Sequence, residues 1–188
     1  MDALLIALLA SAFAEMGDRT QLLAMVLALR FRNDPAVLSA IMLATIVNCA
    51  VSAAGGWLLA GFIGTSARTL FFALSFLFAG AGMLMPVKRP DDVGGWRIGA
   101  FFTSFFAMFI LEFGDKSQFI VAAVAMRTGD PVLSAVGGSL GILLALAPAV
   151  LLRQQFFLQA PLGLIRKGAG GALLLIGAFM ALSAFGLL

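Results

Sequence analysis

Long apolar stretches, separated by short polar segments, dominate the pattern along this chain. A helix that crosses a membrane needs roughly 20 apolar residues, and six stretches meet or approach that length. They cover residues 3–29, 37–64, 69–87, 98–126, 132–152 and 168–187. The segments between them carry prolines, glycines and basic residues, which favour turns. The pattern therefore predicts an all-α integral membrane protein with six transmembrane helices.

The second half of the chain repeats the first. Residues 13–30 align with residues 110–127 at a constant offset of 97. Because each half holds an odd number of predicted spans, the second half would enter the membrane from the opposite side, as in many secondary transporters. We therefore predict two inverted three-helix repeats and a cytoplasmic connecting loop. Their ranges are 1–87 for the first repeat, 88–97 for the loop and 98–188 for the second repeat.

Composition agrees with a membrane protein, and the positions of the basic residues indicate its orientation. Only 11% of residues are charged, about half the usual share in soluble domains. The net charge is +3, but the basic residues are scattered between apolar runs, which disfavours a nucleic-acid surface. The first, third and fifth loops hold eight Lys and Arg, whereas the second and fourth hold two. By the positive-inside rule, both termini lie outside the cytoplasm.

Both repeats carry the same charged hexapeptide inside an apolar stretch. The two copies read Glu15-Met16-Gly17-Asp18-Arg19-Thr20 and Glu112-Phe113-Gly114-Asp115-Lys116-Ser117. Charged side chains at membrane depth cost about 2.5–3.5 kcal/mol each on insertion scales, so they usually mark functional sites. Counted as ionised, each copy carries −1, and the pair carries −2. One divalent cation would neutralise that charge.

The motif side chains have the chemistry of ligands for hard cations. Carboxylate oxygens suit Mn²⁺, Ca²⁺ and Mg²⁺, while histidine is absent and Cys49 is the single thiol. The predicted metal ligands are Glu15, Asp18, Glu112 and Asp115. Further ligands or residues that shape the site are predicted to be Gly17, Arg19, Thr20, Gln21, Asn48, Gly114, Lys116, Ser117 and Gln118. Of these, Asn48 lacks a counterpart in the other repeat and could equally join two helices.

The spacing within each motif predicts how its residues are arranged. On a continuous helix, a glutamate and the aspartate three residues later share one face, and the basic residue four positions on can pair with the glutamate. The glycine between the acids permits either close helix contact or a local break that exposes carbonyl groups. Because carboxylates can bind a cation or protons, the same oxygens offer a route to metal–proton exchange.

The doubled Glu-x-Gly-Asp-Lys/Arg-Ser/Thr motif resembles the signature of the UPF0016 family of cation transporters. That family includes a Golgi protein linked to a glycosylation disorder, its yeast counterpart and bacterial manganese exporters. The resemblance covers essentially the whole chain and places the family motif at the two hexapeptides. It implies transport of Mn²⁺ and, in eukaryotic members, Ca²⁺, in exchange for protons. The short chain looks like the bacterial members, which implies the bacterial inner membrane and periplasmic termini.

Several functions remain as alternatives. The first is secondary active export of Mn²⁺ by cation/proton exchange at a midplane carboxylate site, and a Ca²⁺/proton antiporter differs only in the ion. A passive cation channel and an intramembrane aspartyl protease using Asp18 and Asp115 are the others, although a protease dyad does not need the neighbouring glutamates and cations. We expect no enzymatic activity and no cofactor. The expected partners are a divalent cation, protons and the lipid bilayer, and a homo-oligomer is left open.

Overall fold

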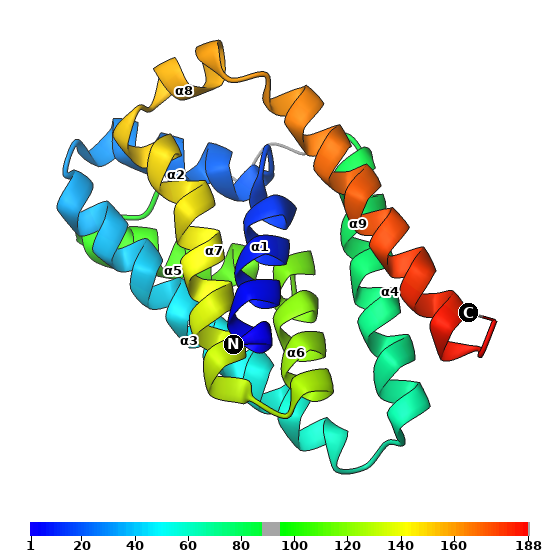
Figure 1. Cartoon of the computed structure of the whole chain (residues 1–188). Helices are drawn as coiled ribbons and strands as arrows, with labels where there is room; N and C mark the ends of the chain where they lie inside the picture. The colour runs from blue at the N-terminus through cyan, green and yellow to red at the C-terminus, as the bar shows by residue number, and fades with distance from the viewer. Residues whose placement is uncertain (88–94, 188) are drawn as a thin grey trace.

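The structure is a computed structural model that describes residues 1–87 and 95–187, and this described part is built from helices alone (Figure 1). Residues 88–94 of the predicted connecting loop, and residue 188, lie outside it. The helices are α1 (Asp2–Glu15), α2 (Arg19–Phe31), α3 (Asp34–Ala60), α4 (Thr65–Leu84), α5 (Gly99–Glu112), α6 (Lys116–Thr128), α7 (Pro131–Leu151), α8 (Gln154–Gln159) and α9 (Leu162–Ala184).

Four helices of the described residues are long and apolar enough to cross a membrane, namely α3, α4, α7 and α9, and α5 is a shorter apolar helix. Their outward faces expose large apolar side chains such as Leu58, Leu144 and Leu175. Water disfavours such a surface, whereas lipid tails accept it. The protein is therefore an integral membrane protein, as its hydropathy predicts. The last apolar helix begins at Leu162, earlier than predicted from residue 168.

The prediction of continuous helices over residues 3–29 and 98–126 is wrong. Each stretch is interrupted at the charged motif, where α1 ends at Glu15 and α5 ends at Glu112. Because the next helices begin only at Arg19 and Lys116, the glutamate and aspartate of a motif do not share one helical face. Hydropathy averaged along a window cannot detect an interruption this short.

The glycine of each motif makes the break. Gly17 and Gly114 both have φ of 72°, in the left-handed region. That conformation costs other residues about 1–2 kcal/mol, so glycine is the residue that can occupy it readily. The next residues, Asp18 and Asp115, are extended and cap the N-termini of α2 and α6. Of the two roles proposed for these glycines, a local break is confirmed at both positions.

Small residues allow the helices to pack closely. In Figure 1, α4 and α9 lie side by side, and α7 lies against α1. A Cβ on Gly80 would come within 2.7 Å of the Gly170 carbonyl oxygen, and one on Gly137 within 2.2 Å of the Leu4 carbonyl oxygen. Such contacts between backbones are the usual means of helix association in membranes. The end of α4 and Arg166 of α9 line a cavity together with charged residues of both motifs.

Polar contacts join the first, third and fifth of the loops between the predicted spans, which we call the odd-numbered loops, at one end of the molecule. Arg153, after α7, pairs with Asp34 at the start of α3 at 2.7 Å. Arg30, near the end of α2, donates a hydrogen bond to the Trp96 carbonyl at 2.6 Å. Arg127, in the fourth loop, instead lies over the ring of Phe72 in the first half of α4. The third loop follows the other end of α4.

Candidate cation site

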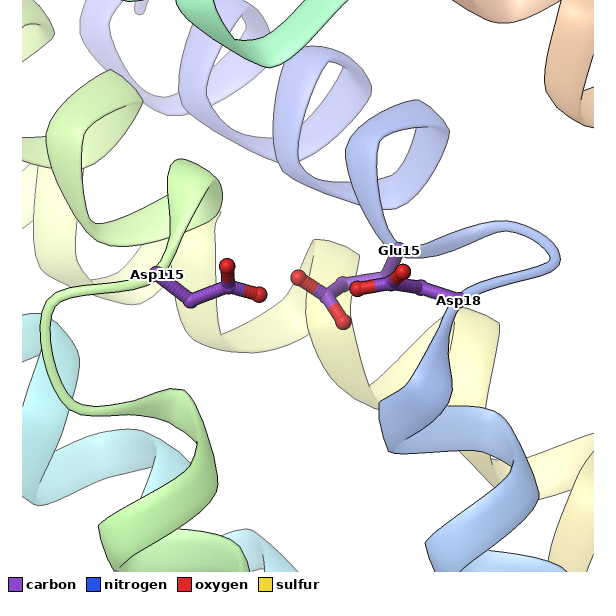
Figure 2. Close-up of side chains that lie close together, drawn as sticks. All are labelled: Glu15, Asp18 and Asp115. Carbon is purple, nitrogen blue, oxygen red and sulfur yellow. The ribbon is translucent and has the colours of Figure 1, made fainter. Parts of the chain in front are cut away.

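Three carboxylates from the two motifs lie together at the helix breaks. One oxygen each from Glu15, Asp18 and Asp115 lie within 4.8 Å of one another (Figure 2). Glu15 is fully buried at the end of α1, Asp18 is 7% exposed at the N-terminus of α2, and Asp115 is partly buried at the N-terminus of α6. The structure thus brings three of the four predicted acids together, although Asp115 is far from Glu15 and Asp18 in the sequence.

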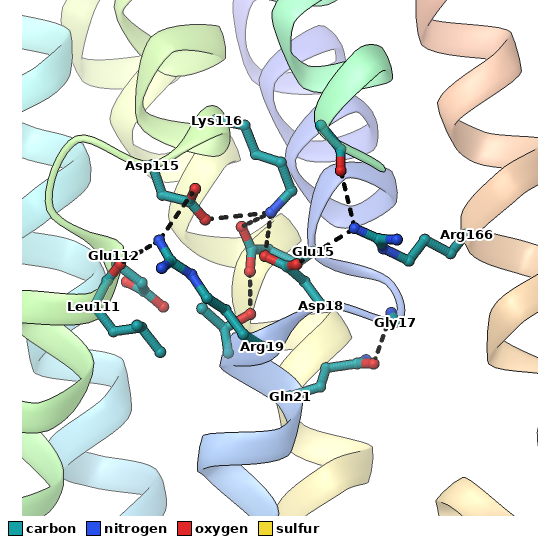
Figure 3. Close-up of polar contacts among 12 residues, drawn as sticks. Glu15, Gly17, Asp18, Arg19, Gln21, Leu111, Glu112, Asp115, Lys116 and Arg166 are labelled. Atoms are coloured by element: carbon teal, nitrogen blue, oxygen red, sulfur yellow. Dashed lines mark hydrogen bonds and ion pairs between the residues drawn. The ribbon is translucent and has the colours of Figure 1, made fainter. Parts of the chain in front are cut away.

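Lys116 lies among these three carboxylates (Figure 3). Its Nζ donates a hydrogen bond to Asp18 Oδ2, and lies 3.2 Å from Asp115 Oδ2 and 3.8 Å from Glu15 Oε1. Arg19 Nη2 lies 3.7 Å from Asp115 Oδ1. The basic residues therefore pair across the two repeats, and the prediction that each pairs with the glutamate of its own motif is wrong.

Glu112, the fourth predicted acid, is fully buried and stands apart from the cluster. The Thr45 hydroxyl on α3 lies 3.3 and 3.5 Å from its two carboxylate oxygens. Asn48, one turn further along α3, donates a hydrogen bond to the Phe109 carbonyl at 3.2 Å, so it joins α3 to α5. Thr45 was missed by the sequence reasoning, and its spacing of three residues from Asn48 is the signal that could have found it.

The neutral predicted residues that follow the two breaks are all buried. Thr20 donates a hydrogen bond to Glu15 Oε2. Gln21 accepts a hydrogen bond from the Gly17 N–H at 2.8 Å and donates one to the Ala145 carbonyl at 2.6 Å, so it ties the first break to α7. In the second repeat, Gln118 accepts a hydrogen bond from Ser52 at 2.6 Å, and Ser117 is fully buried. Within this structure, only Thr20 among the four contacts a clustered carboxylate.

A third basic residue near the cluster, Arg166 on α9, was also missed. Its Nη2 lies 3.9 Å from Asp18 Oδ1. A cavity of about 390 Å³ is lined by Arg166, by the charged residues of both breaks and by the end of α4. We call it the cluster cavity; its lining residues include Asp18, Arg19, Asp115, Lys116 and Arg166. Sequence reasoning had placed Arg166 in a loop because the start of α9 was not recognised.

Buried carboxylates beside a cavity in a helical membrane protein are typical of proteins that move ions or protons across the membrane. The family model described as "Divalent cation/proton antiporter GDT1" matches residues 3–91 and 100–187. A Vibrio cholerae serotype O1 protein named "Putative manganese exporter" is 36% identical over 177 residues, which cover 94% of this chain and 88% of that protein. No solved structure matches. The chain belongs to the divalent cation/proton antiporter GDT1 family, so it is a cation transporter.

Proposed function

We propose that this protein exports Mn²⁺ from the cytoplasm in exchange for protons. The observation that carries the proposal is the cluster of Glu15, Asp18 and Asp115, which both motifs contribute and of which Asp18 and Asp115 line the cluster cavity. Three carboxylates supply hard oxygen ligands of the kind that Mn²⁺ accepts. Membership of a cation/proton antiporter family and the name of the Vibrio cholerae relative support the choice of ion and of exchange.

Lys116 suggests how binding and release are linked. Its ammonium contacts all three carboxylates, so a cation held by the same oxygens has to displace it. A buried carboxylate without a positive partner is costly, and therefore either a metal ion, a lysine ammonium or protons must accompany these acids at each stage. Exchange of one positive partner for another is the basis of the antiport that we propose. The transported ion is a substrate, and we propose no cofactor.

We assign all four predicted acids to the transport site. Glu112 belongs to the proposed site because it is fully buried and immediately precedes the second break. Its hydrogen-bonding neighbours on α3 are the neutral side chains of Thr45 and Asn48. A carboxylate in that setting is suited to accept a proton or a cation during the cycle. Ser117, whose buried hydroxyl oxygen lacks a partner in the described residues, is a further ligand candidate.

We further propose that the chain forms two inverted repeats, 1–87 and 98–188, joined by the 88–97 segment. In this arrangement α1–α2 and α5–α6 act as two broken membrane segments beside α3, α4, α7 and α9, which completes six. The matching breaks at Gly17 and Gly114 support the repeat. The clustering of the odd-numbered loops at one end supports a cytoplasmic position for them, with periplasmic termini in a bacterial inner membrane.

Labelling of introduced cysteines tests this orientation. In a Cys49→Ala background, we expect a cysteine at Gly95 to resist a membrane-impermeant maleimide in intact cells. A cysteine at Ser66, in the first turn of α4, should react from outside, since the loop just before it holds few basic residues. Both sites should react after the cells are permeabilised. Labelling of the Gly95 position from outside, with protection of the Ser66 position, would reverse the orientation.

Flux measurements in proteoliposomes test the function. We expect an imposed proton gradient to drive saturable Mn²⁺ uptake, with opposite proton movement reported by a lumenal pH dye. The same vesicles tested with Ca²⁺ and Mg²⁺ show which ion is preferred, and a clear preference for Ca²⁺ would favour the Ca²⁺/proton antiporter instead. Divalent flux that neither saturates nor moves protons would indicate a passive channel. No divalent flux at all would contradict the proposal.

The protease alternative is disfavoured by one contact. A protease dyad requires two aspartates that share a proton at close range. Here the Lys116 ammonium contacts both Asp18 and Asp115. A positively charged ammonium between two aspartates stabilises both as charged carboxylates, and so it disfavours a proton shared between them. The contact fits the transporters of the family and gives no support to peptide hydrolysis.

A further inference from the structure

Arg166 stands outside both motifs, yet it is the residue through which α9 reaches the carboxylate cluster. Its Nη1 donates a hydrogen bond to the Met85 carbonyl at 2.5 Å, and its Nη2 donates one to the Gly82 carbonyl at 2.9 Å. The same Nη2 lies 3.9 Å from Asp18 Oδ1, and Figure 3 shows the guanidinium of Arg166 facing Asp18. One side chain therefore connects α9, the end of α4 and the first helix break.

The two oxygens of Asp18 are divided between two basic side chains. Lys116 contacts Oδ2, whereas Arg166 lies beside Oδ1. Lys116 contacts three acids, whereas within residues 1–87 and 95–187 Asp18 is the acid that Arg166 contacts. Arg166 Nε is buried and has no hydrogen-bond partner in the described residues, so the guanidinium has an unused donor. It can therefore exchange a carbonyl contact for a closer contact with Asp18.

Arg166 also lines two cavities. The first is the cluster cavity, and the second, of about 400 Å³, is also lined by Gly17, Leu22 and Leu162. A Cβ on Gly17 would meet the Arg166 Cβ and the Leu162 carbonyl oxygen, both at 3.1 Å. The start of α9 therefore packs directly against the first break.

Among the residues that the structure describes, none covers the second break in this way. A Cβ on Gly114 would meet nothing within 4 Å. At the offset of 97 that relates the repeats, Arg166 matches Thr69 on α4, whose hydroxyl donates to the Thr65 carbonyl of its own helix. The basic contact therefore exists in one repeat and not in the other. If the two repeats exchange roles during transport, Arg166 acts on one half of the cycle.

We propose that Arg166 is a positioning residue that latches α9 to Asp18 and takes the place of the transported cation on that carboxylate. The proposal rests on the proposed function and adds a residue that neither motif contains. When a cation binds Asp18, the guanidinium keeps its contacts with the Gly82 and Met85 carbonyls. When the cation leaves, the guanidinium returns to Asp18. Arg166 thus speeds release at the cost of affinity.

Arg166→Gln tests the latch. We expect the dissociation constant for Mn²⁺, measured by titration calorimetry on the purified protein, to fall about fivefold to tenfold, because a competing positive charge is removed. We expect kcat in proteoliposomes to fall by a similar factor and KM to fall with it. A role confined to helix packing would change the yield of folded protein but not the affinity of the folded fraction.

Two further variants complete the experiment. Lys167→Gln removes the same charge from the exposed neighbouring position and should leave the dissociation constant and kcat unchanged. Arg166→Lys keeps the positive charge, but an ammonium lacks the planar group that contacts two carbonyls and a carboxylate at once. The affinity for Mn²⁺ should therefore stay near that of the wild type, while kcat falls in part. Arg166→Lys also provides the test if Arg166→Gln does not fold.

The possible failures can be told apart. Wild-type protein without divalent flux would overturn the proposed function itself. Wild-type transport together with unchanged KM and kcat in Arg166→Gln would overturn only the latch. Weaker Mn²⁺ binding by Arg166→Gln would also overturn it, because loss of a competitor cannot reduce affinity.

Discussion

Asp18→Asn is expected to abolish Mn²⁺ transport while the protein still inserts and folds. Asparagine keeps the shape of the side chain but removes an anionic ligand that both Lys116 and Arg166 contact. An uncompensated charge in a buried setting costs several kcal/mol, and every 1.4 kcal/mol is a factor of ten. We therefore expect Mn²⁺ flux to fall by about two orders of magnitude or more. Proteoliposome flux and growth of a manganese-sensitive strain measure the effect.

Asp2→Asn is the matched control for this substitution. Asp2 is an exposed acid in the first turn of α1, whereas Glu15 of the cluster is the last residue of that helix. The same chemical change there should leave transport and the yield of folded protein unaltered. Proton-coupled Mn²⁺ transport at the wild-type rate by Asp18→Asn would show that the carboxylate cluster is not the transport site.

Which segments form membrane helices and which acids form the site could be predicted from the sequence more readily than how these helices and acids are arranged in space. Long apolar runs predict membrane helices because every backbone polar group in lipid must be satisfied within the segment. Buried charges are rare enough that Glu15, Asp18 and Asp115 could be selected without a structure. The helix break was harder to predict, because Gly17 is compatible both with close helix packing and with a left-handed turn. Only the backbone of the structure distinguishes these two roles.

Contacts between distant segments could not be predicted from spacing. The i to i+4 rule pairs Lys116 with Glu112, but the break rotates the lysine away from that helix face and towards the other motif. Thr45 and Arg166 belong to neither motif. Their contacts with Glu112 and Asp18 depend on which helices pack together. A rule based on local spacing assumes a continuous helix, and it fails where the function requires an interruption.

Lys116→Gln is expected to make the stability of the protein depend on a divalent cation. The lysine is 4% exposed and contacts three carboxylates, which would then repel one another. Removal of one partner from a buried ion pair typically costs about 3–5 kcal/mol. We therefore expect a lower melting temperature in chelator than for the wild type. Because Mn²⁺ would replace the lost positive charge, it should raise that temperature more than it does in the wild type.

Thermal unfolding in detergent, with chelator and with Mn²⁺, measures this difference. Arg127→Gln is the control, since Arg127 is an exposed base that lies over the Phe72 ring, away from the cluster. It should respond to Mn²⁺ as the wild type does, whatever stability it loses. A shift by Mn²⁺ in Lys116→Gln that is no larger than in the wild type would contradict competition between Lys116 and the cation. A larger shift, together with slower Mn²⁺ release in flux assays, would place the ion and the lysine ammonium at the same carboxylates.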